Sequence, residues 1–448
     1  MTVTHLLGPL FTDFYELTMA AGYFNRRCFV PATFSLFIRD YPPGRNYFVA
    51  AGLQDALAEL ESYRFAREDV AYLKETGDFR ADFLAYLERL RFTGQVMALP
   101  EGTVFFADEP ILEVTAPLVE AQIVETFLIN TIGLQTMIAT KAARCVQVAG
   151  GRPLIDFSLR RTQGHDAGLK VARSTYLAGF SGTSNVIAGR EYGIPVSGTM
   201  AHSFVQAFGG DVEAFTAFAE TFPDTSVFLI DTYDTLDGAR AAARVGHTMK
   251  KNGHDLKGVR LDSGDMVQLS RDVRQILDAA GLPEVKIFAS SGFDEFKIKA
   301  AIDQGALIDA FGVGTSVGVS ADAPFIDIVY KMVRCDGRDV QKLSPGKMTL
   351  AGKKQIFREY DEKGFCRTDT IGLRSESLQN RVPMLEPVMQ NGRLVRPHPA
   401  LGEIRERLAQ NLAALPDRYK DLDATVPYPV DVSLHLQQLQ EKLALDSP

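Results

Sequence analysis

Four polar or glycine-rich turns follow four successive apolar segments in the middle of the chain. They are marked by Asp231, Asp262, Ser291 and Gly314, and each lies about one strand-plus-helix unit after the one before it. Small residues let backbone N–H groups approach an anion, and a helix that starts directly after such a turn adds the positive end of its dipole. If the turns meet at one edge of a sheet, they predict a site for a phosphorylated ligand. Ordinary turns without a ligand are the alternative.

The aspartates at these turns divide into two groups. Asp234 and Asp265 come directly before helical patterns, so we expect them to be helix N-caps. Asp231 and Asp262 stand where an apolar segment stops, which favours a functional role. Carboxylates beside phosphate-binding turns suit Mg²⁺ that is held partly through phosphate oxygens, and they also stabilise positive charge that develops at a sugar carbon.

Arginines stand beside the same turns. Arg160 and Arg161 close one apolar segment, and Arg260 closes another directly before Asp262. Guanidinium groups in such positions suit a carboxylate or pyrophosphate ligand, and exposed structural arginines are the alternative. A second basic cluster, expected to be either another anion site or a solvated edge strand, consists of Lys342, Lys347, Lys353, Lys354 and Arg358.

Two further residues have both a structural and a chemical interpretation. His202 follows a small-residue turn, where it is a structural histidine, an acid–base group or a nucleophile, and spacing alone does not decide between these. None of the seven histidines shows a metal-ligand spacing such as HxxxH. Tyr15 lies on an expected helix that Asp13 would cap with support from Glu16, and an aromatic residue there is normally part of the core.

An alternation of strands and helices from about 152 to 333 would position these residues. It indicates a parallel sheet, and the carboxyl ends of its strands carry the site both in a β/α barrel and in an open doubly wound sheet. We prefer the barrel because the polar turns recur with the phase of one β/α unit. The expected strands are 153–157, 227–230, 259–261, 285–289 and 306–311, and the expected helices are 235–250, 265–280, 294–304 and a stretch that begins at 167.

The two ends of the chain have a different pattern. Short alternating strands such as 32–38 and 95–98 precede the alternation, and further strands and a helix at about 401–414 follow it. We therefore expect three parts. These are an N-terminal α+β portion over 1–125, an α/β barrel with the active site over 126–343, and a C-terminal portion over 344–448 that packs with the first.

Composition excludes several classes of protein. The chain of 448 residues has a net charge of −8 and 46% hydrophobic residues, which argues against a disordered chain and against nucleic acid as the main ligand. Its four cysteines are far apart and no export signal is visible, so we expect a cytoplasmic location. The most apolar long stretch, at about 116–138, is interrupted by polar residues and is expected to be a buried helix rather than a membrane span.

Several longer motifs, in the same order over essentially the whole chain, resemble those of nicotinate phosphoribosyltransferases. They are Thr12-Asp-Phe-Tyr-Glu-Leu-Thr-Met19, Gly198-Thr-Met-Ala-His-Ser203, Asp231-Thr-Tyr-Asp234, Arg260-Leu-Asp-Ser-Gly-Asp265, Ser291-Gly-Phe-Asp294, Phe311-Gly-Val-Gly-Thr315 and Pro427-Tyr-Pro429. The resemblance implies an α/β fold with the irregular β/α barrel of type II phosphoribosyltransferases, and an α+β domain built from both ends of the chain.

The same resemblance implies an activity. A phosphoribosyl group would pass from phosphoribosyl pyrophosphate to the ring nitrogen of nicotinate, as the entry step of NAD salvage. ATP would be a co-substrate that phosphorylates His202, and Mg²⁺ would be bound mainly through pyrophosphate. A homodimer with shared active sites is implied as well, in which Tyr15 reaches the site across the dimer interface.

Individual residues also acquire roles from the resemblance. Tyr15 would stack on the nicotinate ring, and Thr199 and Arg260 would contact nicotinate. Arg160 or its neighbour Arg161 would pair with the nicotinate carboxylate or with pyrophosphate. The two aspartates at strand ends, Asp231 and Asp262, would lie near the ribose or Mg²⁺. The 5′-phosphate site would consist of Ser291, Gly292, Gly314 and Thr315.

Three alternatives stay open at this point. Nicotinamide-specific relatives carry an aspartate in the turn that corresponds to 182–185, and this aspartate would repel a carboxylate. This chain has the uncharged Ser184 in that turn, so the repulsion is absent. Ser184 is therefore expected to be a substrate-binding residue, with nicotinate as the better substrate than nicotinamide. Quinolinate would need further cations for its second carboxylate. A catalytically silent phosphosugar-binding protein is the third alternative.

Overall fold

The structure is a computed structural model that describes residues 8–342, 344 and 349–445. The chain forms two compact units, one of Met1–Thr140 with Ala323–Pro448 and one of Lys141–Asp322. The second unit begins later and ends earlier in the sequence than the expected barrel range of 126–343. At the C-terminal end the reason is β12 (Ile328–Cys335), which pairs with β1 (Pro31–Ile38) of the first unit instead of joining the parallel sheet.

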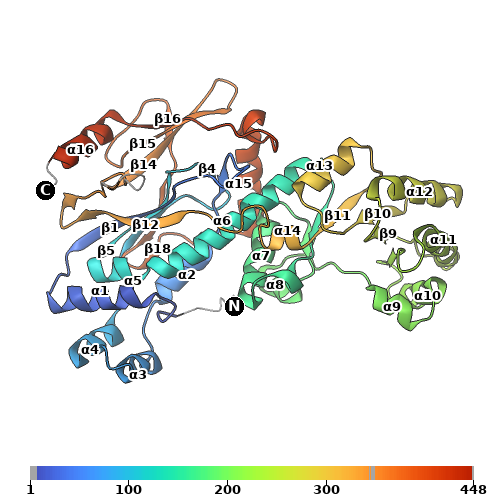
Figure 1. Ribbon diagram of the computed structural model, residues 1–448, viewed down its shortest axis with the longest axis horizontal. Helices are drawn as coiled ribbons and strands as arrows, with labels where there is room; N and C mark the ends of the chain where they lie inside the picture. The colour runs from blue at the N-terminus through green and yellow to red at the C-terminus, as the bar shows by residue number, and fades with distance from the viewer. Residues whose placement is uncertain (1–7, 343, 345–348, 446–448) are drawn as a thin grey trace. The chain divides into compact units, whose positions relative to one another are not determined.

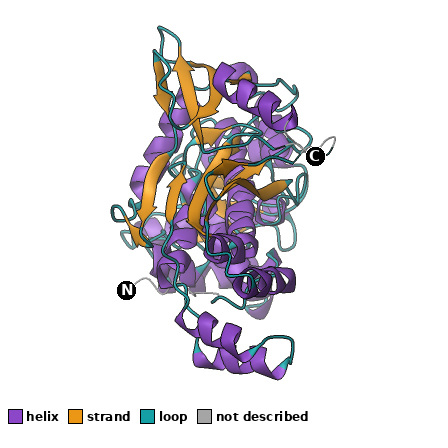
Figure 2. Ribbon diagram, turned by 90° about the vertical axis from the view of Figure 1, so that its left-hand side faces the viewer, coloured by secondary structure: helices purple, strands orange, loops and turns teal. Residues whose placement is uncertain are grey.

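The first unit is built around an antiparallel seven-stranded sheet in the order β13-β12-β1-β5-β3-β17-β18. A four-stranded sheet in the order β16-β14-β15-β19 comes from the C-terminal part of the chain (Figure 1), and Figure 2 distinguishes helices, strands and loops by colour. The other strands of the unit are β2 (Phe48–Val49), β3 (Gln95–Ala98), β4 (Val104–Phe105), β5 (Pro110–Pro117), β13 (Arg338–Asp339), β14 (Lys354–Tyr360), β15 (Cys366–Leu373), β16 (Arg381–Pro383), β17 (Glu386–Gln390), β18 (Arg393–Leu394) and β19 (Val430–Val432).

Helices flank these sheets, and most of them present one apolar face to a shared core that contains residues from both ends of the chain. The helix expected at 401–414 is confirmed with the same bounds. The helices are α1 (Phe14–Asn25), α2 (Leu53–Ser62), α3 (Arg67–Glu75), α4 (Ala81–Arg89), α5 (Leu118–Ile123), α15 (Leu401–Ala414) and α16 (Leu434–Leu445), with a short 3-10 helix at Asp417–Tyr419.

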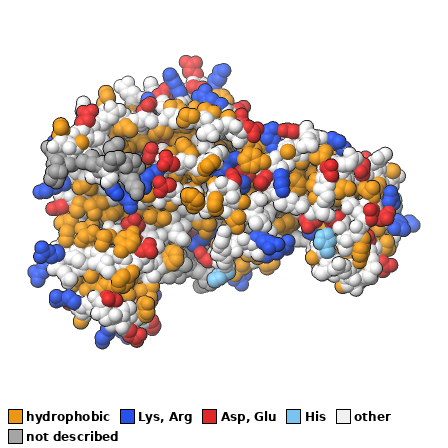
Figure 3. All heavy atoms as spheres, in the orientation of Figure 1, with side chains coloured by type: hydrophobic (Ala, Val, Ile, Leu, Met, Phe, Trp, Pro, Cys, Tyr) orange, Lys and Arg blue, Asp and Glu red, His pale blue; other side chains and the backbone are white. Residues whose placement is uncertain are grey.

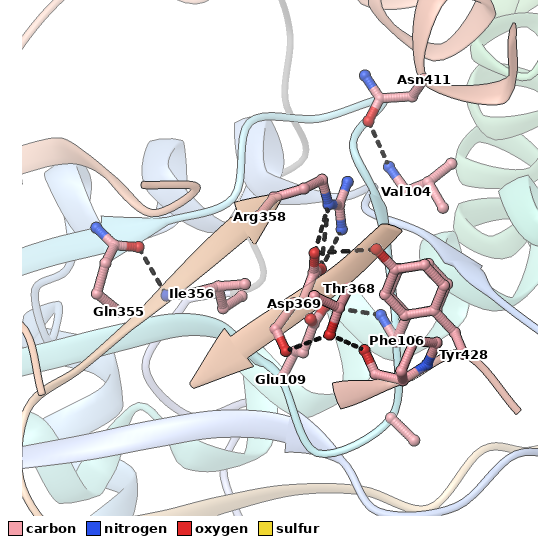
Figure 4. A network of polar contacts seen from close by, with 12 residues as sticks. Val104, Phe106, Glu109, Gln355, Ile356, Arg358, Thr368, Asp369, Asn411 and Tyr428 are labelled. Carbon is pink, nitrogen blue, oxygen red and sulfur yellow. Dashed lines mark hydrogen bonds and ion pairs between the residues drawn. The ribbon is translucent and has the colours of Figure 1, made fainter. Parts of the chain in front are cut away.

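A buried ion pair joins two strands of the four-stranded sheet (Figure 4). Arg358 on β14 donates two hydrogen bonds to Asp369 on β15, from Nε at 2.9 Å and from Nη2 at 2.6 Å, and the Tyr428 hydroxyl donates another at 3.2 Å. Burial and the Asp369 carboxylate hold the pKa of Glu109 well above its ordinary value. The raised pKa favours the neutral form of Glu109 beside Asp369, and removal of either Arg358 or Asp369 would leave an unpaired buried charge.

The start of α1 differs from the expectation. The Asp13 side chain makes no hydrogen bond to the helix, so the expected capping interaction does not form. Glu16 is instead fully buried and accepts hydrogen bonds from Thr12 Oγ1 at 2.7 Å and from Thr126 Oγ1 at 2.6 Å. Burial raises the pKa of Glu16 to about 7.

Replacing Glu16 by glutamine is expected to stabilise the protein at neutral pH but not in acid. The pKa of Glu16 in the folded chain, about 7, lies above its ordinary value of 4.5, so the folded state binds this proton more tightly. That contribution is fully present below the ordinary pKa and is lost as the pH rises through about 7. Urea unfolding should show the free-energy advantage of Glu16→Gln growing by about 2 kcal/mol from acid to neutral pH. A difference that is the same at every pH would contradict this.

The second unit contains a six-stranded parallel sheet in the order β7-β6-β11-β10-β9-β8. Its first strand, β6, pairs with its last, β11, as the first and last strands of a barrel do. Among the described residues no pairing joins β7 to β8, so the barrel is open there. The strands are β6 (Leu154–Asp156), β7 (Gly182–Thr183), β8 (Val227–Leu229), β9 (Gly258–Leu261), β10 (Lys286–Ala289) and β11 (Ala310–Val313). The fold class is thus the expected irregular β/α barrel, as a half-barrel.

Helices follow the strands of this sheet, and α11, α12 and α13 lie beside β9 to β11 in Figure 1. The expected helices that begin at 167, 235, 265 and 294 are confirmed to within two residues at their starts. The helices are α7 (His165–Leu177), α8 (Val186–Tyr192), α9 (His202–Ala207), α10 (Asp211–Thr221), α11 (Thr235–Lys251), α12 (Met266–Ala279), α13 (Glu295–Asp303) and α14 (Thr315–Gly318), with a 3-10 helix at Leu159–Arg161.

One long helical stretch has the length and apolar composition of a membrane span. It covers Leu118–Val148 and includes α5 and α6 (Glu125–Val148), and 72% of its most apolar window is buried in the structure. The stretch at 116–138 is therefore largely the buried helix that the sequence predicts.

Candidate active site

The polar turns predicted to meet do lie together at the carboxyl ends of the parallel strands. Three of the four, those at Asp262, Ser291 and Gly314, line a pocket of 610 Å³ within the second unit. Most of the predicted site residues line it, namely Arg160, Ser184, Thr199, His202, Arg260, Asp262, Ser291, Gly292, Gly314 and Thr315. Lys and Arg side chains are interspersed with Asp and Glu on the face shown in Figure 3. This face shows no broad basic surface, so an anion bound here would depend on local cationic groups.

Two small-residue turns form one side of the pocket. Ser291 and Gly292 have positive φ angles of 106° and 64°, an uncommon conformation for serine. Gly314 and Thr315 form the second turn, at the end of β11. The ammonium of Lys297 lies 3.4 Å from the position that a Cβ of Gly292 would occupy. This cation beside the first turn suits a phosphate group, and the sequence analysis missed it because Lys297 lies on a helix rather than in a turn.

Two linked aspartates, Asp262 in the pocket lining and Asp231 behind it, lie beside these turns. Asp262 accepts a hydrogen bond from the Ser290 hydroxyl, and its backbone N–H donates to Asp231 Oδ2 at 2.9 Å. Asp231 also accepts from the Ser263 hydroxyl at 2.6 Å, while its Oδ1 is buried without a hydrogen-bond partner among the described residues. Asp231 does not line the pocket. Its predicted role near the ribose or Mg²⁺ would therefore depend on its contact with Asp262 or on Oδ1.

The third group of residues is cationic. Arg260 donates from Nη1 to Thr199 Oγ1 at 2.6 Å, and its buried Nε has no hydrogen-bond partner in the described part of the chain. Burial lowers the pKa of Arg260, and the nearby charge of Arg160 acts in the same direction. Arg160 and Arg161 are both exposed and both line the pocket. An anionic ligand here would relieve the repulsion and occupy the free donor of Arg260.

An aromatic side chain that the sequence analysis did not single out also lines the pocket. Phe157 directly follows β6, and a Cβ on Gly312 would lie only 2.6 Å from its ring, so glycine is needed for the ring to pack against β11. Buried Asp156 fixes the backbone beside it by accepting from Ser158 N at 2.9 Å and from Thr183 Oγ1 at 2.7 Å. Phe157 and Ser184 both belong to the lining of the pocket.

His202 begins α9, in the segment that spans the opening of the barrel between β7 and β8. Its Nδ1 lies 3.1 Å from Thr232 Oγ1, and its Nε2 lies 3.8 Å from Asp262 Oδ2. With Nδ1 engaged by threonine, Nε2 is the nitrogen on the Asp262 side. The side chain is 42% exposed, so a reagent can reach it from the pocket.

Several sequence predictions have a definite outcome outside the pocket. Asp234 and Asp265 are confirmed as N-caps, since each accepts from two backbone N–H groups of its helix. Both interpretations of the second basic cluster are wrong for Lys354 and Arg358, because both are buried in ion pairs, with Glu113 at 3.0 Å and with Asp369. Lys347 lies outside the described residues.

Tyr15 and a metal site are the remaining expectations. Tyr15 lies on α1 of the first unit and is 48% exposed. Burial and the Glu125 carboxylate raise the pKa of Tyr15 to about 12, so its ring is neutral near pH 7. No cluster of three or more metal-ligating side chains occurs among the described residues. A divalent cation in the pocket would therefore need oxygens from a ligand.

Comparison with known proteins adds the family. The profile of the nicotinate phosphoribosyltransferase (NAPRTase) family matches residues 153–368, which carry the pocket. The profiles of the NAPRTase N-terminal and C-terminal domains match residues 10–133 and 379–440. The chain belongs to the nicotinate phosphoribosyltransferase family.

Relatives in this family match over almost their full length. The chain is 49% identical to nicotinate phosphoribosyltransferase pncB2 of Mycobacterium tuberculosis, over 97% of this chain and 93% of the relative. It is 39% identical to nicotinate phosphoribosyltransferase of Bacillus subtilis, over 95% and 92%. The structure of human nicotinic acid phosphoribosyltransferase matches with a TM-score of 0.86 at 30% identity, covering 96% of this chain and 99% of the human one. The fold and the order of the domains are thus those of the nicotinate phosphoribosyltransferase family.

Proposed function

We propose that this chain transfers the phosphoribosyl group of phosphoribosyl pyrophosphate to the ring nitrogen of nicotinate, releasing pyrophosphate and nicotinate mononucleotide. One observation carries the proposal. A single pocket joins two small-residue turns with an arginine whose buried Nε lacks a partner among the described residues. The turns suit the 5′-phosphate, and the arginine suits a carboxylate. Membership of the family supports the same reaction.

The pocket supports a displacement at the anomeric carbon of the ribose. The nicotinate ring nitrogen carries its lone pair at neutral pH, so the reaction needs no general base. Positioning therefore contributes more than proton transfer. As pyrophosphate departs, positive charge grows on the ribose, and the Asp262 carboxylate would stabilise it. The hydrogen bond from Ser290 and the backbone link to Asp231 hold this carboxylate in place.

The acceptor side of the pocket favours an acid over an amide. Ser184 carries no charge, whereas an aspartate at this position would repel a carboxylate. Arg260 offers its free Nε, and Thr199 orients the guanidinium through the 2.6 Å hydrogen bond. Phe157 supplies an aromatic face for a pyridine ring. Quinolinate remains the alternative acceptor, with both Arg160 and Arg161 available for its second carboxylate.

We further propose ATP as co-substrate and His202 as the residue that it phosphorylates. Since Nδ1 of His202 is engaged by Thr232, the phosphoryl group would be carried on Nε2. Its charge would then lie beside Asp262, which calls for a cation. Mg²⁺ bound mainly by pyrophosphate, with Asp262 and the free oxygen of Asp231 as its protein partners, would neutralise the charge of the departing group.

The proposed active form is a homodimer in which Tyr15 completes the site of the partner subunit. An apolar group of exposed side chains at the start of the chain supports a covered surface there, and it consists of Leu10, Phe11, Phe14 and Tyr15.

A product assay tests the proposed function. Purified chain is given phosphoribosyl pyrophosphate and Mg²⁺ with nicotinate, nicotinamide or quinolinate in turn, with and without ATP. We expect mononucleotide from nicotinate, with a higher yield when ATP is present. Product from another pyridine would reassign the acceptor pocket around Ser184. No product from any acceptor would favour the silent phosphosugar-binding protein.

A further inference from the structure

A buried cation outside the pocket contacts the segments that carry both phosphate-binding turns. Lys141 on α6 is 1% exposed, and its Nζ lies 2.6 Å from Glu295 Oε2 and 2.6 Å from Asp322 Oδ1. Arg144, one helical turn further along α6, pairs with Glu295 Oε1 at 3.0 Å. The four side chains form a charge-balanced cluster, and none of them lines the pocket.

The first arm of this cluster leads to the Ser291–Gly292 turn. Glu295 is the first residue of α13, and the turn precedes it by three residues. Its carboxylate is fully buried, so the start of α13 is fixed to α6. The Phe296 ring lies under both cations, 5.8 Å from Lys141 Nζ and 5.5 Å from the Arg144 guanidinium carbon. The turn therefore leads directly into a helix end that cannot shift without breaking these contacts.

The second arm leads to the Gly314–Thr315 turn. Asp322 follows α14, and a tight chain reversal at Ser320, with φ of 45°, connects them. Two backbone hydrogen bonds close this reversal, from Ser320 N to Val317 O at 3.0 Å and from Ala321 N to Ser316 O at 3.0 Å. These hydrogen bonds fix the backbone between Thr315 and Asp322, so a shift of Asp322 would also shift the Gly314–Thr315 turn.

We infer that Lys141 is a positioning residue that sets the separation of the two phosphate-binding turns from outside the pocket. A phosphate held by both turns is sensitive to their spacing, because each hydrogen bond weakens steeply when its geometry departs from the optimum. Loss of the Lys141 charge would leave Glu295 and Asp322 in mutual repulsion and let the turns move apart. The inference rests on the proposed function for the identity of the ligand, phosphoribosyl pyrophosphate.

The effect on the two substrates separates this role from a merely structural one. Phosphoribosyl pyrophosphate spans both turns, whereas nicotinate is assigned to the Arg260 and Ser184 side. Lys141→Met is therefore expected to raise the KM for phosphoribosyl pyrophosphate about 10- to 50-fold and to change the KM for nicotinate by less than about twofold. Lys141→Arg keeps the charge and should recover part of the loss.

A milder variant and a matched control complete the test. Asp322→Asn breaks only the second arm, at a partly exposed residue, and is expected to raise the KM for phosphoribosyl pyrophosphate about threefold to tenfold. Asp369→Asn makes the same substitution in the buried Arg358 pair of the first unit, and should lower the thermal midpoint without this selective effect. Unchanged KM for phosphoribosyl pyrophosphate in a folded Asp322→Asn, or equal changes for both substrates, would overturn the inference.

A binding measurement keeps the two proposals distinguishable. Calorimetry with ribose 5-phosphate needs no turnover and is carried out on the unaltered chain, Asp322→Asn and Asp369→Asn. If the unaltered chain makes no mononucleotide but binds ribose 5-phosphate more tightly than Asp322→Asn does, the proposed reaction fails and the positioning role stands. If mononucleotide is made and the affinities are equal, the positioning role fails and the reaction stands.

Discussion

Replacing Asp262 by alanine is expected to lower kcat about 10²- to 10³-fold while changing the KM for nicotinate by less than about threefold. The reason lies in when the carboxylate acts. In the proposed reaction, positive charge develops on the ribose only as the bond to pyrophosphate breaks, so the charge of Asp262 would stabilise the transition state more than the bound substrates. Steady-state kinetics with both substrates varied would show the loss in kcat.

Two further variants isolate this effect. Asp262→Asn keeps the shape and the acceptor for the Ser290 hydroxyl, so a similar fall in kcat would assign the effect to the charge. Asp265→Ala, three residues along the same turn, removes an N-cap and should cost about 1 kcal/mol of stability while leaving kcat within about twofold. Unchanged turnover in Asp262→Ala would remove this residue from the proposed mechanism.

Replacing His202 by alanine is expected to abolish labelling of the protein by [γ-³²P]ATP and to remove the stimulation of product formation by ATP. Basal turnover without ATP should persist at a reduced level, because the two small-residue turns and Arg260 stay in place. The geometry behind this expectation is the orientation of the ring, with Nδ1 engaged by Thr232 and Nε2 on the Asp262 side. Acid-labile, base-stable label in the unaltered chain identifies a phosphohistidine.

His254 provides the matched control for this experiment. It pairs with Asp224 at 2.9 Å and does not line the pocket, so His254→Ala should retain both the label and the ATP effect. Equal labelling of His202→Ala and the unaltered chain would place the phosphoryl group elsewhere. Absence of label in the unaltered chain, together with an absence of ATP stimulation, would leave a transferase without ATP coupling.

Much of the parallel sheet and its site could be predicted from local sequence. A polar turn after a strand, followed by an N-cap residue such as Asp234 or Asp265, predicts where the next helix starts. The same turn also marks the carboxyl edge of the sheet. That edge is where the turn residues of β/α units converge, so the sequence pattern alone places Asp262, Ser291 and Gly314 near one another. His202 is connected with them only through the family resemblance.

What the sequence could not predict depends on long-range packing. Lys354 and Arg358 have the pattern of a solvated strand, yet their partners Glu113 and Asp369 come from other strands and make the pairs buried. Phe157 becomes a pocket residue only because Gly312, on the last strand of the barrel, lets its ring pack closely. The opening of the barrel between β7 and β8 likewise depends on which strands form hydrogen bonds with each other, and the strand propensity of the residues does not predict it.

The insertion of one unit within the other has a consequence for synthesis on the ribosome. β1 lies between β5 and β12 in the finished sheet, and all but the first of its residues are buried. β5 emerges soon after β1, but β12 emerges only after the whole second unit has been made. At about 5–20 residues per second, the interval between the synthesis of β1 and that of β12 is on the order of 15 to 60 s. Throughout it, one edge of an apolar strand has no neighbour, which makes the nascent chain a substrate for strand-edge aggregation and for chaperones that shield it.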